Sequence, residues 1–414
     1  MPASLVLSLA ACLGPLQEGD PVAAWSEDVL QLVSELERMH PDPYFGCPRE
    51  EFEPAVDSFL GGIEGSSEAE TTVELMRLMA LLARNGRDGH SVVWPLRARY
   101  LPLQLYSFED GWFVVDAEAE QRSWIGASVV SIGGAPVEEV YTRLAPLITR
   151  DNEWNLRLKL GGALVCGDIL AGAGIATDPA RIRLELARDG ASQRVELAAV
   201  PMDMHLLWGR PALPARPGVT WLEGRERSWR LQVLEAERAL YLQYNEVAPV
   251  DHEGQTLEDF AKELVRTFEE RALAKVIVDV RSNGGGDNTT FPPLIRALQS
   301  PSINRPGVLF GLIGRATFSA AGNFVTVLER DTQAVLIGEP TGGAPNQYGD
   351  ARDVRLPNHA DVLVRISTRY HQFGGAGDAR LTHEPRVAVP LTSQDYFTGR
   401  DPVLQAALSY EVPR

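Results

Sequence analysis

Val308-Leu-Phe-Gly-Leu-Ile-Gly-Arg-Ala-Thr-Phe-Ser-Ala-Ala-Gly-Asn323 is the stretch of sequence that decides the fold class. It opens with a short apolar run, which is typical of a strand that is covered on both faces. Small residues around Ser319 follow, and residues 320–330 then have the apolar spacing of a helix. The order strand, turn, helix predicts one unit of an α/β layer. The serine in the turn either caps the helix or exposes its hydroxyl as a nucleophile.

A second unit of this kind lies directly upstream. Asp279-Val-Arg-Ser-Asn-Gly-Gly-Gly286 runs from an apolar strand, residues 275–280, into three consecutive glycines. The run has neither the G-x-G-x-x-G spacing nor the Lys-Ser/Thr pair of nucleotide-binding loops. A left-handed turn seldom needs three glycines. We therefore expect a nest of backbone N–H groups that binds a developing oxyanion.

Composition indicates a large globular protein. The chain has 414 residues, of which 44% are hydrophobic, and this length suggests two or three domains. The formal net charge of −17 disfavours nucleic acid and anionic membranes as partners. The three cysteines are isolated and the seven histidines lack metal-ligand spacing. We therefore expect no metal site, no disulfide framework and no cofactor.

The first residues have the character of an export signal. Residues 1–14 are apolar and rich in small side chains, and Leu9-Ala-Ala-Cys12 resembles a lipoprotein cleavage box. These features predict an exported protein, periplasmic, envelope-bound or extracellular, with possible membrane attachment through a lipid on Cys12. No Lys or Arg precedes Arg38, so the charged start of a signal is missing. The alternative is a disordered tail on a cytoplasmic protein.

Hydrophobic periodicity divides the chain into four parts and predicts an α+β multidomain protein. A helical domain with three amphipathic segments precedes a strand-rich domain with a clear hairpin around Arg188-Asp-Gly190, and an α/β domain follows. The predicted parts are the signal-like segment 1–20, the helical domain 21–99, a small β-barrel at 100–201 with an insertion at 141–178, and the α/β domain 202–414.

Six ordered blocks resemble the tail-specific (C-terminal-processing) serine peptidase family, whose relatives include the tricorn core protease and the interphotoreceptor retinoid-binding protein modules. The blocks are residues 88–91, 126–137, 279–286, 317–321, 338–343 and 384–402. The resemblance implies a PDZ-like β-barrel, a crotonase-like ββα core and a serine endopeptidase acting on protein or peptide substrates. The PDZ-like part would hold a substrate C-terminus by strand addition.

The catalytic residues follow from these motifs. Ser319 is the expected nucleophile, and the N–H groups of Gly285, Gly286 and Ala320 are the expected oxyanion donors. Many family members use a lysine base after the Gly-Glu-x-Thr motif, but Ala344 stands at that place in this sequence. The tricorn-like arrangement instead implies His90, because histidine titrates near neutral pH.

The acid that would orient His90 is predicted less directly. Asp378 lies about where the family places a carboxylate, while Asp350, Glu339 and Asp88 compete for that role. Glu339 and Asp350 are otherwise expected to support the site. Because the family lysine is missing, the alternative function is a non-proteolytic protein of the same fold that binds ligands or partners.

Overall fold

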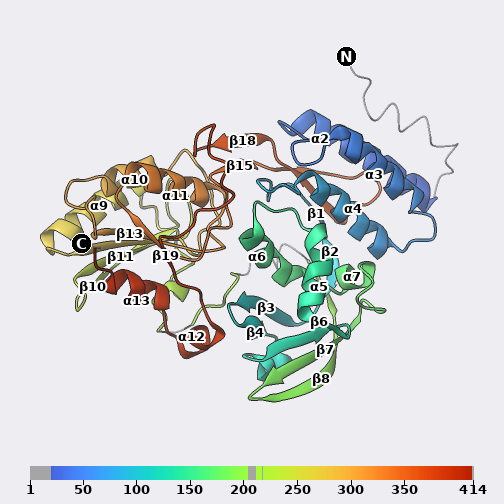
Figure 1. The fold of residues 1–414 in the computed structure, drawn as a ribbon, viewed down its shortest axis with the longest axis horizontal. Coiled ribbons are helices and arrows are strands. Elements are labelled where there is room, and N and C mark those ends of the chain that lie inside the picture. The colour runs from blue at the N-terminus through green and yellow to red at the C-terminus, as the bar shows by residue number, and fades with distance from the viewer. Residues whose placement is uncertain (1–19, 204–210, 217, 413–414) are drawn as a thin grey trace.

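A computed structural model describes residues 20–203, 211–216 and 218–412. Cys12, and with it almost all of the expected segment 1–20, lies outside the described residues. The chain forms a mixed α/β multidomain structure (Figure 1), which confirms the predicted fold class at this level. Within the described residues, no helix combines the length and the apolar character that crossing a membrane requires.

The C-terminal half is built on a six-stranded sheet. Five strands are parallel and the first edge strand is antiparallel, in the order β10-β11-β12-β13-β14-β19. The strands are β10 (Trp229–Leu234), β11 (Ala239–Tyr244), β12 (Lys275–Asp279), β13 (Leu309–Ile313), β14 (Val335–Gly338) and β19 (Val387–Ala388). The parallel arrangement explains the continuous apolar runs, because helices cover both faces.

The covering helices are unequal on the two faces (Figure 1). One face carries α9 (Leu257–Glu270), α10 (Pro292–Leu298) and α11 (Ala320–Asp331). The other face carries α13 (Pro402–Ser409), which is preceded by the short α12 (Ser393–Thr398). The opening stretch of the sequence therefore forms β13, a turn and α11, as predicted.

The N-terminal half shares one hydrophobic core between helices and strands. The three predicted helices are present as α2 (Pro21–Met39), α3 (Arg49–Gly61) and α4 (Glu68–Leu82). Helix α4 starts with a capping box, in which Ser67 and Glu70 satisfy each other's backbone N–H groups.

An antiparallel sheet follows these helices, in the order β3-β4-β5-β7-β8, with β6 paired to β5. Its strands are β3 (Leu103–Phe108), β4 (Gly111–Ala117), β5 (Ser128–Ile132), β6 (Ala135–Pro136), β7 (Arg181–Arg188) and β8 (Ala191–Ala198). The predicted insertion is helical. It contains the second half of α5 (Val137–Leu144), then α6 (Glu153–Ala163) and α7 (Gly167–Gly172), with a short 3₁₀ turn at Ala145–Leu147.

Three small sheets complete the described structure, and one of them connects the two halves of the chain. Strand β1 (Val92–Pro95) pairs with β17 (Val362–Ile366), which also pairs with β16 (Arg352–Val354). A second pair is β15 (Asn346–Gly349) with β18 (Arg369–Gln372), and a third is β2 (Arg97–Tyr100) with β9 (Val200–Asp203). The β1–β17 pairing matters most for the site, because it attaches the segment that carries His90 to the C-terminal half.

Candidate active site

Ser319 occupies a strained turn between β13 and α11. Its backbone angles are φ 53° and ψ −128°, a conformation that non-glycine residues adopt only when the surroundings enforce it. The Ser319 side chain makes no capping hydrogen bond to the helix. The capping interpretation is therefore wrong, and the turn has the character of a nucleophile elbow that projects its hydroxyl.

Neighbouring loops hold this turn in place. The Thr317 hydroxyl donates to the Val280 carbonyl at 2.8 Å, and the Phe318 N–H donates to the Asn283 carbonyl at 3.1 Å. On the other side, the Gly343 N–H donates to the Thr317 carbonyl at 3.0 Å. These bonds tie the serine turn to the glycine turn and to the loop after β14, so the strain at Ser319 is opposed by hydrogen bonds on two sides.

His90 reaches the site from a turn that Asp88 organises. One carboxylate oxygen of Asp88 accepts the N–H groups of His90 and Ser91 at 3.2 and 2.9 Å, and the hydroxyl of Ser367 at 2.7 Å. The other oxygen bonds Nε2 of the buried His40 at 3.2 Å. Because Ser367 directly follows β17, Asp88 fixes the histidine turn to the C-terminal half.

The two predicted catalytic side chains meet. Nε2 of His90 lies 2.9 Å from Oγ of Ser319, although 229 positions separate them in the chain. The Phe318 ring stacks on the imidazole, with ring centroids 4.4 Å apart. If Nε2 accepts the serine proton, Nδ1 carries the ring hydrogen. Nδ1 is buried and has no hydrogen-bond partner among the described residues, so stacking, not a carboxylate, orients this ring.

Burial shifts the pKa of each of His90 and Asp88 in one direction, and the polar neighbours of each shift it in the other. Burial lowers the pKa of His90 to about 4, although the nearby Asp88 carboxylate opposes the shift. Burial alone would raise the pKa of Asp88, but its hydrogen bonds from His40 and Ser91 outweigh this effect and lower the pKa to about 2. At neutral pH the site therefore combines a neutral imidazole with an ionised Asp88.

The glycine turn packs directly against the serine. A Cβ placed on Gly285 would lie 2.6 Å from Cβ of Ser319 and 3.0 Å from the Ala320 nitrogen. Gly285 has φ +119° and Gly286 has φ +136°, so the turn favours glycine for conformation as well as for space.

The three expected oxyanion donors differ in whether their N–H groups already have a hydrogen-bond acceptor. The Gly285 N–H donates to the Asn283 side chain at 2.9 Å, so it is already engaged. In the part of the chain that the structure describes, the N–H groups of Gly286 and Ala320 have no hydrogen-bond acceptor. These two donors remain the stronger candidates.

The structure does not bring Asp378 to the catalytic pair. Its carboxylate binds the Arg380 side chain at 2.8 Å and accepts the Arg380 N–H at 3.0 Å, a local arrangement across two residues. Among the described residues, Asp378 makes no hydrogen bond to His90, whose Nδ1 has no acceptor, so the interpretation of Asp378 as the orienting acid is wrong.

The two supporting carboxylates also have other partners. Glu339 forms a buried two-bond ion pair with Arg315, at 3.0 and 2.7 Å. Asp350 contacts Arg369 and His371 at 3.4 and 3.3 Å. Neither carboxylate bonds His90, so neither lies beside the reacting atoms as a direct partner of the imidazole.

Sequence reasoning missed a buried pair behind the histidine turn. Lys159 on α6 donates to the carbonyls of Gly89 and Thr149 at 2.5 and 2.8 Å. Asp151 accepts the N–H groups of Gly89 and Ala344 at 2.6 and 3.1 Å. Burial lowers the pKa of Lys159 and raises the pKa of Asp151. Residues from the insertion thus bind the N–H and the carbonyl of Gly89, directly before His90, and the N–H of Ala344.

A cavity of about 560 Å³ opens beside His90. Its wall is mainly apolar and comes from both halves of the chain, which includes Trp94, Leu105, Leu147, Leu158 and Phe318. An apolar side chain of a bound peptide would fit this environment.

Comparison with known proteins supports the fold. No family model matches the chain, and no curated protein matches it in sequence. Among solved structures, mature CPAF complexed with lactacystin is similar, with 14% identity, a TM-score of 0.63, and coverage of 94% of this chain and 99% of that one.

Weaker structural similarities extend to two solved proteases. The photosystem II D1 C-terminal processing protease has 13% identity and a TM-score of 0.39, with 94% of each chain covered. Tricorn protease has 12% identity and a TM-score of 0.39, with 93% of this chain and 36% of that chain covered. The resemblance to tail-specific peptidases that the motifs predicted is confirmed at the level of the fold.

Proposed function

We propose that this chain, which has the fold of tail-specific peptidases, is a serine-type endopeptidase that uses Ser319 as its nucleophile and His90 as its base. The observation that carries the proposal is the 2.9 Å contact between Nε2 of His90 and Oγ of a conformationally strained Ser319. Hydroxyl, base and glycine turn together provide the parts that acyl transfer requires.

The reaction follows from these groups. His90 takes the Ser319 proton as Oγ attacks the peptide carbonyl, and the N–H groups of Gly286 and Ala320 bind the resulting oxyanion. Each such donor lowers the barrier by roughly 3 kcal/mol. The imidazolium then gives its proton to the leaving amine, and a water activated by neutral His90 hydrolyses the acyl-enzyme.

The imidazolium formed in the first step needs support, because burial disfavours it. The ionised Asp88 supplies that support through space, and Phe318 keeps the ring in place. We assign Asp88, rather than Asp378, the role of the acid that assists His90. This is a positioning and electrostatic role, because Asp88 bonds the backbone of His90 and not its ring.

The antiparallel sheet of the N-terminal half fits a PDZ-like role. In this proposal, residues 100–201 form a PDZ-like domain and residues 202–414 form the crotonase-like core. An extended substrate would add to an edge strand of the sheet, β3 or β8. Export and lipidation at Cys12 also remain proposals, which mass spectrometry of the mature N-terminus would test.

A direct test compares the wild type with the Ser319→Ala variant. Wild-type protein should cleave an unfolded protein substrate and react with a fluorophosphonate probe. The variant should lose at least ~10³-fold in turnover, lose the labelling, and keep the thermal midpoint. Labelling that persists in the variant would show that another residue is the nucleophile.

The orphaned Nδ1 of His90 favours the alternative of a non-proteolytic binding protein of the same fold. In that case the apolar cavity beside His90 would hold a ligand instead of a substrate side chain. The alternative predicts no turnover and no labelling, together with an apolar ligand that is retained on purification and lost when the cavity is filled by Leu105→Trp.

A further inference from the structure

One buried carboxylate contacts both the histidine turn and the loop that packs against the serine turn. Asp151 lies just before α6 and is completely buried. Its Oδ1 accepts the N–H of Gly89 at 2.6 Å, and Gly89 directly precedes His90. Its Oδ2 accepts the N–H of Ala344 at 3.1 Å, in the loop that follows β14. Each oxygen of this carboxylate therefore holds a different part of the site.

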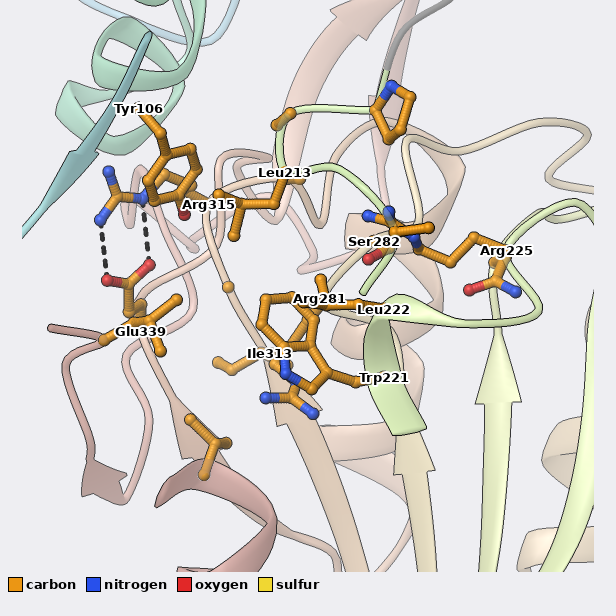
Figure 2. Close-up of a pocket in the computed structure, with 18 of the residues that line it drawn as sticks. Tyr106, Leu213, Trp221, Leu222, Arg225, Arg281, Ser282, Ile313, Arg315 and Glu339 are labelled. Atoms are coloured by element: carbon orange, nitrogen blue, oxygen red, sulfur yellow. Dashed lines mark hydrogen bonds and ion pairs between the residues drawn. The ribbon is translucent and has the colours of Figure 1, made fainter. Parts of the chain in front are cut away.

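The loop after β14 packs directly on the serine turn. The Gly343 N–H donates to the Thr317 carbonyl at 3.0 Å, and a Cβ placed on Gly343 would lie 3.3 Å from the Ser319 nitrogen. At the start of this loop, Glu339 binds Arg315 of the serine turn through two hydrogen bonds, which Figure 2 shows as dashed lines. A movement of the loop would therefore displace the serine turn.

Asn152 adds a second attachment to the same loop. Its Oδ1 accepts the Asn155 N–H at 2.9 Å and so caps the start of α6. Its side-chain NH₂ group donates to three backbone carbonyls at 3.0, 3.1 and 2.6 Å, those of Thr341, Gly342 and Leu381. Residues 151 and 152 together therefore join the start of α6 to the loop after β14.

The histidine turn has little room to move away from Asp151. The Asp151 carbonyl accepts the Arg87 N–H at 3.1 Å, so both the backbone and the side chain of Asp151 bind this turn. A Cβ placed on Gly89 would lie 2.7 Å from Oδ1 of Asn155 and 3.1 Å from Cζ of Phe318. Gly89 is therefore enclosed between α6 and the ring that stacks on the imidazole.

A charge at this place is poorly explained by stability alone. Burial raises the pKa of Asp151, and the N–H groups of Ala344 and Gly89 and the charge of Lys159 oppose that shift. Replacing a buried charge by an apolar side chain often stabilises a fold. A carboxylate has only acceptor oxygens, so it can hold two N–H groups from different segments at a fixed separation.

We propose that Asp151 and Asn152 are positioning residues, which set the distance between Nε2 of His90 and Oγ of Ser319. Their side chains bind backbone groups on either side of the catalytic pair and not the reacting atoms. The inference rests on the proposed peptidase function, because the distance matters when a proton passes between these two atoms. A misplacement of about 1 Å costs on the order of 10²-fold in rate. Substrate binding does not depend on that distance.

The experiment replaces each residue conservatively in the full-length protein. Asp151→Asn keeps one acceptor oxygen and turns the other into an N–H donor, which cannot accept a backbone N–H. Asn152→Ser keeps an oxygen that caps α6 and removes the three bonds to the loop. In each variant, kcat for a peptide substrate should fall roughly tenfold or more, while KM stays within about twofold of the wild-type value.

Asp28 on α2 provides a matched control. It is also completely buried, and its two oxygens accept the N–H groups of Asn358 and His359 at 3.0 and 3.1 Å. Like Asp151, it therefore holds two backbone N–H groups of the C-terminal half, but far along the chain from either catalytic turn. Asp28→Asn should lower the thermal midpoint as Asp151→Asn does and leave the kcat of the folded protein unchanged.

A second measurement does not depend on turnover. In protein that carries isotope-labelled histidine, the nitrogen NMR resonance of Nε2 of His90 reports its hydrogen bond to Ser319. His90→Gln assigns this resonance. Asp151→Asn should move it towards its position in Ser319→Ala, and Asp28→Asn should leave it in place. Circular dichroism shows which variants are folded.

The outcomes are distinct. The proposal is overturned if a folded Asp151→Asn variant keeps the wild-type kcat or the wild-type His90 resonance, if its loss is carried by KM, or if Asp28→Asn shows the same losses. If Asp151→Asn does not fold, Asn152→Ser decides by the same criteria. Absence of turnover in the wild type would refute the peptidase function, and the His90 resonance would then still show whether Asp151 positions the imidazole.

Discussion

Two clusters in this protein combine a hydroxyl, an imidazole and nearby carboxylates, and only one of them has the features of an active site. Behind α11, Nε2 of His383 lies 2.9 Å from the Thr326 hydroxyl, and its Nδ1 lies 3.1 Å from Glu329. By hydrogen-bond geometry alone, this group is a more complete triad than Ser319 with His90, whose Nδ1 has no acceptor among the described residues.

The environments of Thr326 and Ser319 indicate instead that Ser319 is the reactive hydroxyl. Thr326 lies inside a regular helix, is 2% exposed, and also bonds the Gly322 carbonyl, while the His383 side chain is fully buried. Ser319 instead has a strained backbone, a glycine turn within contact distance and a cavity beside its histidine. Access, strain and free N–H donors therefore distinguish a reactive hydroxyl from a structural one more reliably than a chain of hydrogen bonds.

The largest effect on activity is expected when the two histidines of these clusters are replaced in separate variants. His90→Gln should lower kcat/KM by about 10³-fold, because general-base catalysis is lost. His383→Gln should destabilise the fold by about 1–3 kcal/mol, because buried partners lose a hydrogen bond, while the folded fraction keeps its activity. Turnover and urea unfolding measured on both variants decide the matter. Equal losses of activity at unchanged stability would place His383 in the mechanism.

The glycine turn offers the next largest effect. Gly285→Ala should lower kcat/KM by about 10²-fold, because the new Cβ would displace Ser319. Gly284→Ala is the matched control, since a Cβ there meets nothing within 4 Å. Kinetics with a peptide substrate and fluorophosphonate labelling rates report the difference. Similar activity of the two variants would mean that the turn readily moves away from the serine.

Asp88 should matter more than Glu329, its counterpart in the other cluster. Asp88→Asn removes a buried charge that several donors share, so we expect a destabilisation of about 2–3 kcal/mol and a roughly tenfold lower kcat/KM through loss of imidazolium support. Glu329→Gln should cost less than about 1 kcal/mol, because its half-exposed pair with Arg380 is screened by solvent. Chemical unfolding and kinetics of both variants test this order.

The pH dependence of activity should report His90. The imidazole acts as a base only when it is neutral, so kcat/KM should fall as the pH drops through about 4, the pKa of His90. In Asp88→Asn this acidic limb should move to lower pH, because a nearby negative charge that favours the imidazolium is gone. Rates are measured alongside circular dichroism to confirm that the protein stays folded. A limb near pH 6.5 would contradict a buried, neutral base.

The smallest expected effect belongs to Asp378. Asp378→Asn should change kcat/KM by less than about twofold, because the carboxylate pairs with Arg380 and not with His90. Asp350→Asn serves as a companion variant, since its partners are also outside the catalytic pair. A loss of 10²-fold or more at Asp378 would restore the sequence-based interpretation.

The sequence predicted the strands of the C-terminal sheet and the serine turn for local reasons. Apolar runs that are covered on both faces mark β12 and β13, and the small residues around Ser319 mark a close approach of backbone. The meeting of His90 with Ser319 came from family motifs, because no periodicity reports a contact across 229 positions.

Other features of the site could not be predicted from local sequence patterns, because they depend on tertiary packing. Lys159 stands in a helix where a lysine is usually exposed, and only the packing of α6 behind Gly89 buries it. Asp378 was misassigned because position along the chain does not reveal that Arg380 binds it.

The β1–β17 ladder has a consequence for biosynthesis. Val92 pairs with Arg365, so the strand that follows His90 finds its partner only after the chain has been made as far as β17. A nascent chain on the ribosome, or a fragment that ends before Val362, therefore has the serine turn without a fixed base. Such a chain should lack the proposed peptidase activity until residues 362–366 have been made.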